Sequence, residues 1–343
     1  MNLSPLVDEA KLEAYLASHL AGEAGPLRAE KIHAGHSNET FRLSRGAGRW
    51  VLRRPPRGPL LPTAHDVLRE WRVMTTLAGA GYPVPRPVLA CDDSAVIGAP
   101  FYLMQQVEGH VFRNSLPPEF ADPADRALIA DQLIRALVAL HAIDYTAAGL
   151  GGLGRPDGYI ARQIKRWMSQ LESARTRPLL DLDAVSAWLQ KSMPESPPAA
   201  IVHGDFRLDN VIFASEPPPH LIAVLDWEMS TLGDPLADLG YLLSFWREPG
   251  EPVSTPLPDD MGDITSLPGF PSRAALAERY AELSGRPVTH LNFYIVLAIW
   301  KLAILLEGSY NRHLAGTTDD PFFALLGEGV PALARRARVL SGV

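Results

Sequence analysis

The first hundred residues alternate between short strand-like runs and helical stripes. Leucines near the start, from Leu6 to Leu20, predict a helix that ends at Gly22 and Gly25. Further on, apolar runs bounded by polar turns predict strands, and one stripe at helical spacing predicts a helix. The strand runs are Ile32, 41–43, 50–53 and 101–104, and the helical stripe is Val67, Trp71 and Met74.

The rest of the chain is dominated by helical stripes. They predict helices over 133–140, 159–171 and 182–189. The apolar segment 291–306 is only 16 residues long and contains Asn292 and Lys301. Because a membrane-spanning helix needs ~20 residues, we expect a buried helix there instead. A chain of 343 residues exceeds the usual size of one core, so we expect two lobes with a shared cleft.

A polar turn lies between two apolar runs in the second half of the chain. It reads His-Gly-Asp-Phe-Arg-Leu-Asp-Asn from His203 to Asn210, and the second apolar run, 221–225, leads to Asp226. Asp205 and Asn210 have the five-residue spacing with which a kinase catalytic loop places a base and a metal ligand. We therefore predict Asp205 as the catalytic base and Asn210 and Asp226 as Mg²⁺ ligands, with His203 bracing the turn.

Two other interpretations fit parts of the same pattern. Acidic turns between strands are common, and His-Gly-Asp alone has little specificity, so the prediction depends on the ordered combination of strands, turn and Asp226. A hydrolase would use Ser37 of the 35–39 segment, with His203 and Asp226 as its partners. The fifth residue of that segment is glutamate rather than the glycine of a nucleophile elbow, which argues against a hydrolase.

The segments HGDFRLDNVIF and LDWEMSTLGDPLADL resemble the aminoglycoside phosphotransferase and choline kinase group of small-molecule kinases. GHSNETFRL, WVLRRPP, LREWRVM and GYPVPRP are similar to the subgroup whose kinase-like domain is fused, in some proteins, to acyl-CoA dehydrogenases. The resemblance covers nearly the whole chain. It implies an α+β, bilobal protein-kinase-like fold with ATP and Mg²⁺ as cofactors. The implied parts are a β-rich N-lobe at 1–104, a hinge at 105–109 and a larger, mostly helical C-lobe at 110–343.

The resemblance also suggests which residues bind the nucleotide. Ser37 and Asn38 lie at a small polar turn that could present N–H and hydroxyl groups to phosphate. Arg53 falls where protein kinases have lysine, and Arg54 is the second choice for that position because strand alternation places it on the other face. Glu70 is the expected ion-pair partner of Arg53.

The hinge is expected to bind adenine through its backbone. Gln105 and Val107 are its candidate residues, and a GTP preference stays open because side-chain identity matters little for such contacts.

The chain departs from the protein-kinase pattern at two positions. Gly204 replaces the arginine that grips a phosphorylated activation loop, so we expect a site that assembles without phosphorylation. Glu228 replaces the glycine of the DFG motif, and a water-mediated or outer contact to the metal is expected there. Asp234 and Asp238 are predicted to cap or brace the following helix against the catalytic loop. His141, at the end of a leucine stripe, is predicted to be structural.

Net charge and cysteine content limit the classes of partner and the compartment that we expect. A net charge of −7 argues against nucleic acid and anionic membranes, which need a basic excess. The single cysteine, Cys91, excludes an internal disulfide, and no apolar signal segment begins the chain, so we expect a cytoplasmic protein whose oligomeric state the sequence does not fix.

The expected partner is a small acceptor with a hydroxyl group. Residues 310–313 are neutral to basic, which favours a neutral or anionic acceptor such as a hydroxy acid or its coenzyme A ester. An aminoglycoside or other antibiotic kinase, and a nucleotide-binding pseudokinase without transfer activity, are the alternatives. The loop 248–271, rich in proline, glycine and acids, is either a substrate lid or a plain surface excursion.

Overall fold

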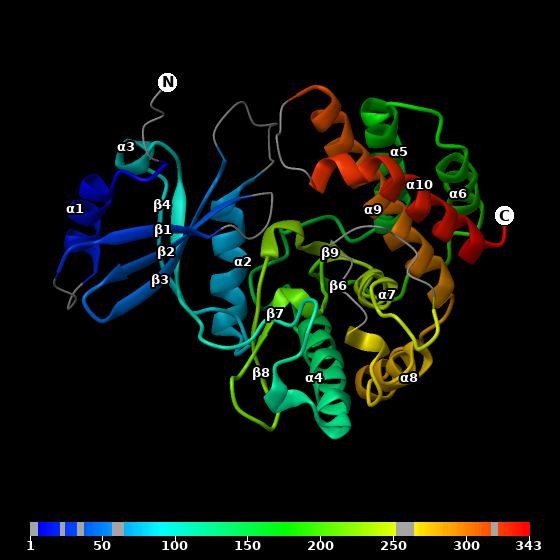
Figure 1. The fold of residues 1–343 in the computed structure, drawn as a ribbon, viewed down its shortest axis with the longest axis horizontal. Helices are drawn as coiled ribbons and strands as arrows, with labels where there is room; N and C mark the ends of the chain where they lie inside the picture. Colours follow the sequence, from blue (N-terminus) through cyan, green and yellow to red (C-terminus); the bar gives the residue numbers. More distant parts are fainter. Residues whose placement is uncertain (1–5, 21–24, 33–37, 57–64, 252–263, 317–321) are drawn as a thin grey trace. The chain divides into compact units, whose positions relative to one another are not determined.

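In a computed structural model the chain divides into two compact units, and each is described by itself. The first unit comprises Met1–Glu108 and Ala223–Glu228, and the second comprises Gly109–Ile222 and Met229–Val343. The structure describes residues 6–20, 25–32, 38–56, 65–251, 264–316 and 322–343 (Figure 1).

The first unit is built on an antiparallel five-stranded sheet with the strand order β1-β2-β3-β5-β4. Its strands are β1 (Arg28–Ile32), β2 (Glu39–Arg45), β3 (Gly48–Arg54), β4 (Pro87–Cys91) and β5 (Phe101–Gln105). Its helices are α1 (Glu9–His19), α2 (Val67–Gly79) and the short α3 (Ser94–Ile97). In the register of β3, Arg53 lies between Thr40 of β2 and Tyr102 of β5, at the centre of the sheet. The predicted strands and the α2 helix are confirmed.

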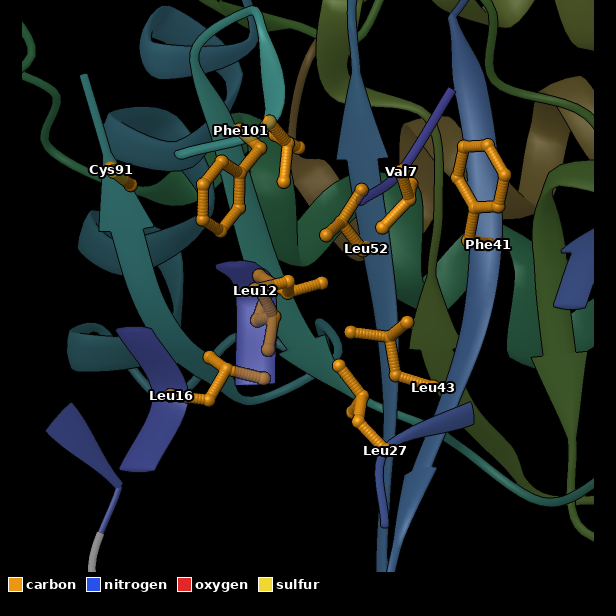
Figure 2. Packing of buried hydrophobic residues seen from close by; sticks show 11 residues of the cluster. Val7, Leu12, Leu16, Leu27, Phe41, Leu43, Leu52, Cys91 and Phe101 are labelled. Atoms are coloured by element: carbon orange, nitrogen blue, oxygen red, sulfur yellow. The ribbon is translucent and has the colours of Figure 1, made fainter. Parts of the chain in front are cut away.

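The two faces of the sheet have different chemistry. Leu52 points into an apolar cluster that includes Leu12 and Leu16 of α1, as Figure 2 shows, and Cys91 is part of the same cluster. Arg53, the next residue along β3, points to the opposite face, where α2 lies. Alternation along one strand thus separates the hydrophobic core from the charged groups of this unit.

The second unit is mostly helical. Its helices are α4 (Pro123–Ala142), α5 (Tyr159–Ala174), α6 (Leu180–Lys191), α7 (Leu236–Ser244), α8 (Arg273–Ser284), α9 (Leu291–Leu314) and α10 (Phe322–Ser341). Its short strands are β6 (Ala200–Val202), β7 (Val211–Phe213) and β9 (Thr231–Gly233), and in β8 (Leu221–Val224) the chain passes back to the first unit. β6 pairs with β9, and β7 forms a sheet with β8. The predicted α+β class is confirmed.

Helix α9 corrects one expectation. It runs on to Leu314 and has 24 residues, so the argument from a short apolar segment was wrong. In the described part of the chain it is the one helix long and apolar enough to cross a membrane, and 56% of its most apolar window is buried inside the structure. Trp300, Ala303 and Ile304 are fully buried, which confirms the prediction of a packed helix.

Candidate functional site

The turn between β6 and β7 brings Asp205 and Asn210 together. The Asn210 side-chain amide donates to the Asp205 carboxylate at 2.7 Å and to the Asp205 backbone carbonyl at 2.8 Å. Because the amide nitrogen is used in this way, the Asn210 carbonyl oxygen is left for another partner. The predicted pairing of these two residues on one turn is confirmed.

Buried groups of the second unit hold the backbone of this turn. Asp238 of α7 accepts hydrogen bonds from the His203 N–H at 2.6 Å and the Gly204 N–H at 2.8 Å. The Asp205 N–H donates to Nδ1 of His203, which is fully buried. Burial raises the pKa of Asp238, but hydrogen bonding to His141 and nearby positive charge outweigh it, so the pKa lies below its usual range. The predicted bracing roles of His203 and Asp238 are confirmed.

His141 and Asp234 extend this support. His141 lies 3.3 Å from the Asp238 carboxylate and 2.8 Å from the Tyr280 hydroxyl, so the prediction that it is structural is confirmed. The reason differs from the one expected, because these contacts hold it rather than the carboxyl end of α4. Asp234 accepts from the Leu236 N–H at 2.9 Å and from the Tyr294 hydroxyl at 2.8 Å, and it therefore fixes the start of α7 as predicted.

The backbone explains the glycine at position 204. Gly204 has φ of +87°, a conformation that other residues seldom adopt, and a Cβ there would lie 2.8 Å from the Met229 carbonyl oxygen. An arginine at this position would be strained and too close to Met229. The departure from the kinase pattern therefore follows from the shape of the turn.

Sequence reasoning missed two residues that lie against the turn. Nζ of Lys301, on α9, donates to the Gly204 carbonyl at 3.1 Å and lies 5.4 Å from the Tyr241 ring centre. Burial raises the pKa of Tyr241, and the negative charge of Asp205 adds to the shift. A small cavity of about 30 Å³, lined by Lys301, Gly204 and Asp238 among others, adjoins them. The available signal was a lone lysine within the apolar segment 291–306.

In the first unit, Arg53 is the centre of a charged cluster, hereafter the Arg53 cluster, that also contains Glu70, Asp226 and Glu228. Nη1 of Arg53 lies 2.6 Å from Glu70 and 3.2 Å from Oδ1 of Asp226, and Nη2 lies 3.7 Å from Glu228. The predicted ion pair with Glu70 is confirmed. Burial raises the pKa of Glu70, and the Arg53 guanidinium opposes that shift.

Arg54 has a different environment. It is 3% exposed on the core face of the sheet, and its guanidinium donates to the backbone carbonyls of Leu6 and Ile97. Nη1 is used by these carbonyls and Nε by the Pro55 carbonyl, and the burial of the side chain keeps a phosphate away. The structure therefore gives Arg54 a structural role and removes it as the second choice for the nucleotide contact.

Asn38 contacts the Arg53 cluster, and Asp226 within the cluster has an uncommon backbone conformation. The Asn38 amide donates to Glu228 at 3.0 Å, so Glu228 is held by a side chain of the β1–β2 turn. Ser37, the other candidate of that turn, lies outside the described residues. Asp226 has φ of +65°, an uncommon conformation for a residue other than glycine. Such backbone strain is often found at functional sites.

The oxygen donors of Asn210 and Asp226 suit a magnesium ion. Mg²⁺ in phosphoryl-transfer sites is bound through one or two protein carboxylates together with substrate phosphates. Asp226 is partly exposed and Arg53 contacts only its Oδ1, and Asn210 has a carbonyl oxygen available. Within the described residues, no three His, Cys, Asp or Glu side chains form a metal-binding group, which is compatible with such a sparse ligand set.

The predicted hinge follows β5. The Gln105 N–H donates to the Arg86 carbonyl and the Gln106 N–H to the Arg49 carbonyl, so both amides are used inside the first unit. Val107 has no such backbone partner among the residues that the structure describes. Of the two hinge candidates, Val107 is therefore the one whose N–H can meet a ligand.

The structure bears on three further expectations, which concern residues 310–313, the loop 248–271 and the hydrolase alternative. Tyr310 and Asn311 pack against the segment after α5, since Arg177 lies over the Tyr310 ring and Asn311 donates to the Ala174 carbonyl. The loop 248–271 contains residues 252–263, which lie outside the described residues, so the lid stays a prediction. The hydrolase alternative loses support because His203 is fully buried within the turn.

Comparison with known proteins adds the family. The model of the phosphotransferase enzyme family matches residues 28–276. Acyl-CoA dehydrogenase family member 11 of Gallus gallus is 38% identical in an alignment that covers 97% of this chain but only 43% of that protein. The chain therefore spans less than half the length of this relative.

Solved structures agree with the family match. A Ralstonia eutropha protein described as an aminoglycoside phosphotransferase is 35% identical, with a TM-score of 0.82 and 98% of each chain covered. Choline kinase from Cryptosporidium parvum is only 10% identical but has a TM-score of 0.66 over 98% of this chain and 96% of that chain. The second likeness concerns the fold alone.

Proposed function

The chain belongs to the phosphotransferase enzyme family, and on that premise we propose that it transfers the γ-phosphoryl group of ATP to the hydroxyl of a small acceptor. The observation that carries the proposal is the 2.7 Å hydrogen bond between Asn210 and Asp205 on a turn held by buried groups. Phosphoryl transfer depends mainly on positioning and charge stabilisation, and a fixed carboxylate beside an amide oxygen can provide both.

Asp205 is the proposed base. Its carboxylate accepts a hydrogen bond from the acceptor hydroxyl and takes the proton as the acceptor oxygen bonds to the γ-phosphorus. The bond from that phosphorus to the bridging oxygen breaks, and the nucleoside diphosphate leaves. Arg207 lies 3.6 Å from Asp205 and 3.0 Å from Asp209, so positive charge is available beside the base.

Asn210 and Asp226 are the proposed ligands of Mg²⁺. The bound ion would neutralise charge on the phosphate oxygens. Asn210 offers its side-chain carbonyl and Asp226 a carboxylate, both hard oxygen donors of the kind that Mg²⁺ prefers. The two residues belong to different units, so their sharing of one ion is part of the proposal.

The nucleotide is proposed to bind the first unit. Arg53 would contact phosphate oxygens with its planar guanidinium, and Glu70 would hold that guanidinium in place. Asn38 would support the same region through Glu228. The Val107 N–H would donate a hydrogen bond to the purine ring of the nucleotide. These hydrogen-bond donors do not separate ATP from GTP, so both nucleotides belong in the test.

We propose a hydroxy acid or its coenzyme A ester as the acceptor. The support is the similarity to a protein described as an acyl-CoA dehydrogenase family member, together with the neutral to basic residues 310–313. Lys301 adds one partly buried cation beside the turn 203–210. An aminoglycoside is a polycation, and a cation at this position does not favour it.

The test is a donor-consumption screen with the whole chain. ATP and GTP are each combined with hydroxyacyl thioesters, free hydroxy acids, aminoglycosides and choline-like alcohols. Asp205→Asn is run beside the wild type, and Asp209→Asn, four residues along the same turn, is the matched control. Loss of a general base should lower transfer by ~10²–10⁴ with nucleotide affinity preserved, and the control should change far less.

The outcomes separate the alternatives. Transfer to a hydroxylated acceptor that is lost in Asp205→Asn supports the proposal. Nucleotide binding without transfer to any acceptor would favour a pseudokinase. Normal transfer by Asp205→Asn would remove Asp205 as the base.

A further inference from the structure

Lys301 is a partly buried cation to which the proposed transfer step gives no part. It lies on α9, almost one hundred residues after the catalytic turn, yet its Nζ donates to the Gly204 carbonyl at 3.1 Å. We propose that Lys301 is a positioning residue that fixes the peptide group carrying Asp205. The inference rests on the proposed function, because Asp205 is the base assigned there.

The peptide group between Gly204 and Asp205 is held at both ends. Its carbonyl accepts from Lys301, and its N–H donates to Nδ1 of His203 at 3.2 Å. The preceding N–H, that of Gly204, donates to Asp238 at 2.8 Å. The buried His203 and Asp238 and the partly buried Lys301 therefore fix successive polar groups of the backbone, and Lys301 is the one that comes from α9. Rotation of this peptide would move the Asp205 carboxylate directly.

The surroundings of Lys301 explain how an ammonium group tolerates this position. Its Nζ lies 5.6 Å from the Trp167 ring centre and 5.4 Å from the Tyr241 ring centre, so two aromatic faces flank the charge. Burial lowers the pKa of Lys301, while the charges of Asp205 and Asp238 oppose that shift. Polar and aromatic groups thus replace the water that the ammonium loses.

An apolar residue would be the simpler choice for packing alone. The neighbours Trp300, Ala303 and Ile304 are fully buried, and an ion at such a site is costly unless its partners compensate it. Replacing a buried ion with a well-packed apolar side chain is often neutral or stabilising. A lysine that only filled space would therefore be dispensable, whereas one that positions the turn would not be.

This difference gives a direct test with Lys301→Met in the whole chain. We expect thermal stability equal to or above that of the wild type, with kcat lowered by ~10- to 100-fold because the base is misplaced. The KM for nucleotide should stay within about twofold, since the proposed nucleotide contacts lie in the other unit. Lys301→Arg, which keeps the charge and a donor, should restore part of kcat.

Amide hydrogen exchange gives a readout that needs no phosphoryl-acceptor substrate. Amides of the turn 203–210 should exchange faster in Lys301→Met, while amides elsewhere on α9 keep their protection. Lys165→Met is the control, because Lys165 is exposed on α5, the helix that carries Trp167. It should change neither kcat nor exchange. If Lys301→Met does not fold, Lys301→Leu replaces it in the same measurements.

The outcomes distinguish this inference from the proposed function. Lower kcat with faster exchange of the turn, and no loss of stability, supports it. Unchanged kcat and unchanged exchange overturn it, and so does a large loss of stability that accounts for the lower activity. If the wild type transfers phosphate to no acceptor, the proposed function fails, and exchange at the turn alone then decides the role of Lys301.

Discussion

The turn 203–210 and the Arg53 cluster use charged side chains in opposite ways. At the turn, the charged groups of Asp238 and Lys301 bond to backbone N–H and carbonyl groups. In the Arg53 cluster, side chains face side chains, and one guanidinium meets the carboxylates of Glu70, Asp226 and Glu228. Two buried atoms there, Arg53 Nε and Glu70 Oε2, have no hydrogen-bond partner among the described residues.

The two arrangements suit two different tasks, fixing a loop and binding a ligand. Charges that bond to the backbone fix the shape of a loop, so the turn should hold Asp205 in place before substrate binds. A cluster with one guanidinium, three carboxylates and unused polar atoms retains capacity for ligands, as a site for phosphate and a cation requires. The first arrangement predicts losses of rate, and the second predicts losses of binding.

The largest expected effect is that of Arg53→Met. Removing one partner of a buried pair leaves an uncompensated charge on Glu70 and should cost about 3–5 kcal/mol of unfolding free energy. Nucleotide binding should also be lost. The measurements are chemical denaturation and calorimetric titration with a non-hydrolysable ATP analogue.

A double variant separates the two effects. Arg53→Met combined with Glu70→Met removes the unpaired carboxylate, so most of the stability should return while nucleotide binding stays lost. Recovery of binding together with stability would show that Arg53 acts only on the fold and would contradict the ligand role of the Arg53 cluster.

Asp238→Asn should have an intermediate effect. The variant weakens charge-assisted hydrogen bonds to the His203 and Gly204 amides, each worth about 1.5–3 kcal/mol, and kcat should fall together with stability. An increase in kcat or an unchanged kcat at reduced stability would contradict the proposed fixing of the turn.

The pH dependence of stability checks the same residue. The pKa of Asp238 is depressed in the folded protein, so its stabilisation is fully present above its unfolded pKa and is lost as the pH falls through the folded value. The stability difference between wild type and Asp238→Asn should therefore be constant above about pH 5 and shrink at lower pH. Denaturation curves across pH measure it, and a difference that grows in acid would refute the assignment.

Asn38→Ala should have the smallest effect. It removes the 3.0 Å hydrogen bond to Glu228, and a partly buried bond to a charged group contributes ~1–2 kcal/mol. Magnesium-nucleotide affinity should weaken by about tenfold or less, with little change in kcat. Unchanged affinity in the titration would mean that Asn38 does not support the Arg53 cluster.

Local sequence patterns predicted most of the fold and the candidate catalytic and metal-binding residues of the turn 203–210. Strand alternation placed Arg53 and Arg54 on opposite faces, and the spacing of Asp205 and Asn210 brought them together. The extent of α9 was missed because its apolar run ends before the helix does, and the later turns are polar.

The remaining site residues depend on tertiary contacts that one sequence does not reveal. Lys301 stood out only as an interruption of an apolar segment, and nothing in its neighbours indicates that it reaches Gly204. The link between Asn38 and Glu228 joins residues 190 positions apart. Such pairings are set by packing rather than by local propensity.

The central claim is that Asn210 and Asp226, one from each unit, hold the same magnesium ion. Binding of Mn²⁺ in place of Mg²⁺, measured by electron paramagnetic resonance with a non-hydrolysable ATP analogue, tests it through Asn210→Ala, Asp226→Ala and the double variant. If both residues ligate one ion, the loss in the double variant should differ from the sum of the single losses by at least ~1 kcal/mol. Losses that add to within ~0.5 kcal/mol would show that the two residues act independently and would contradict the account.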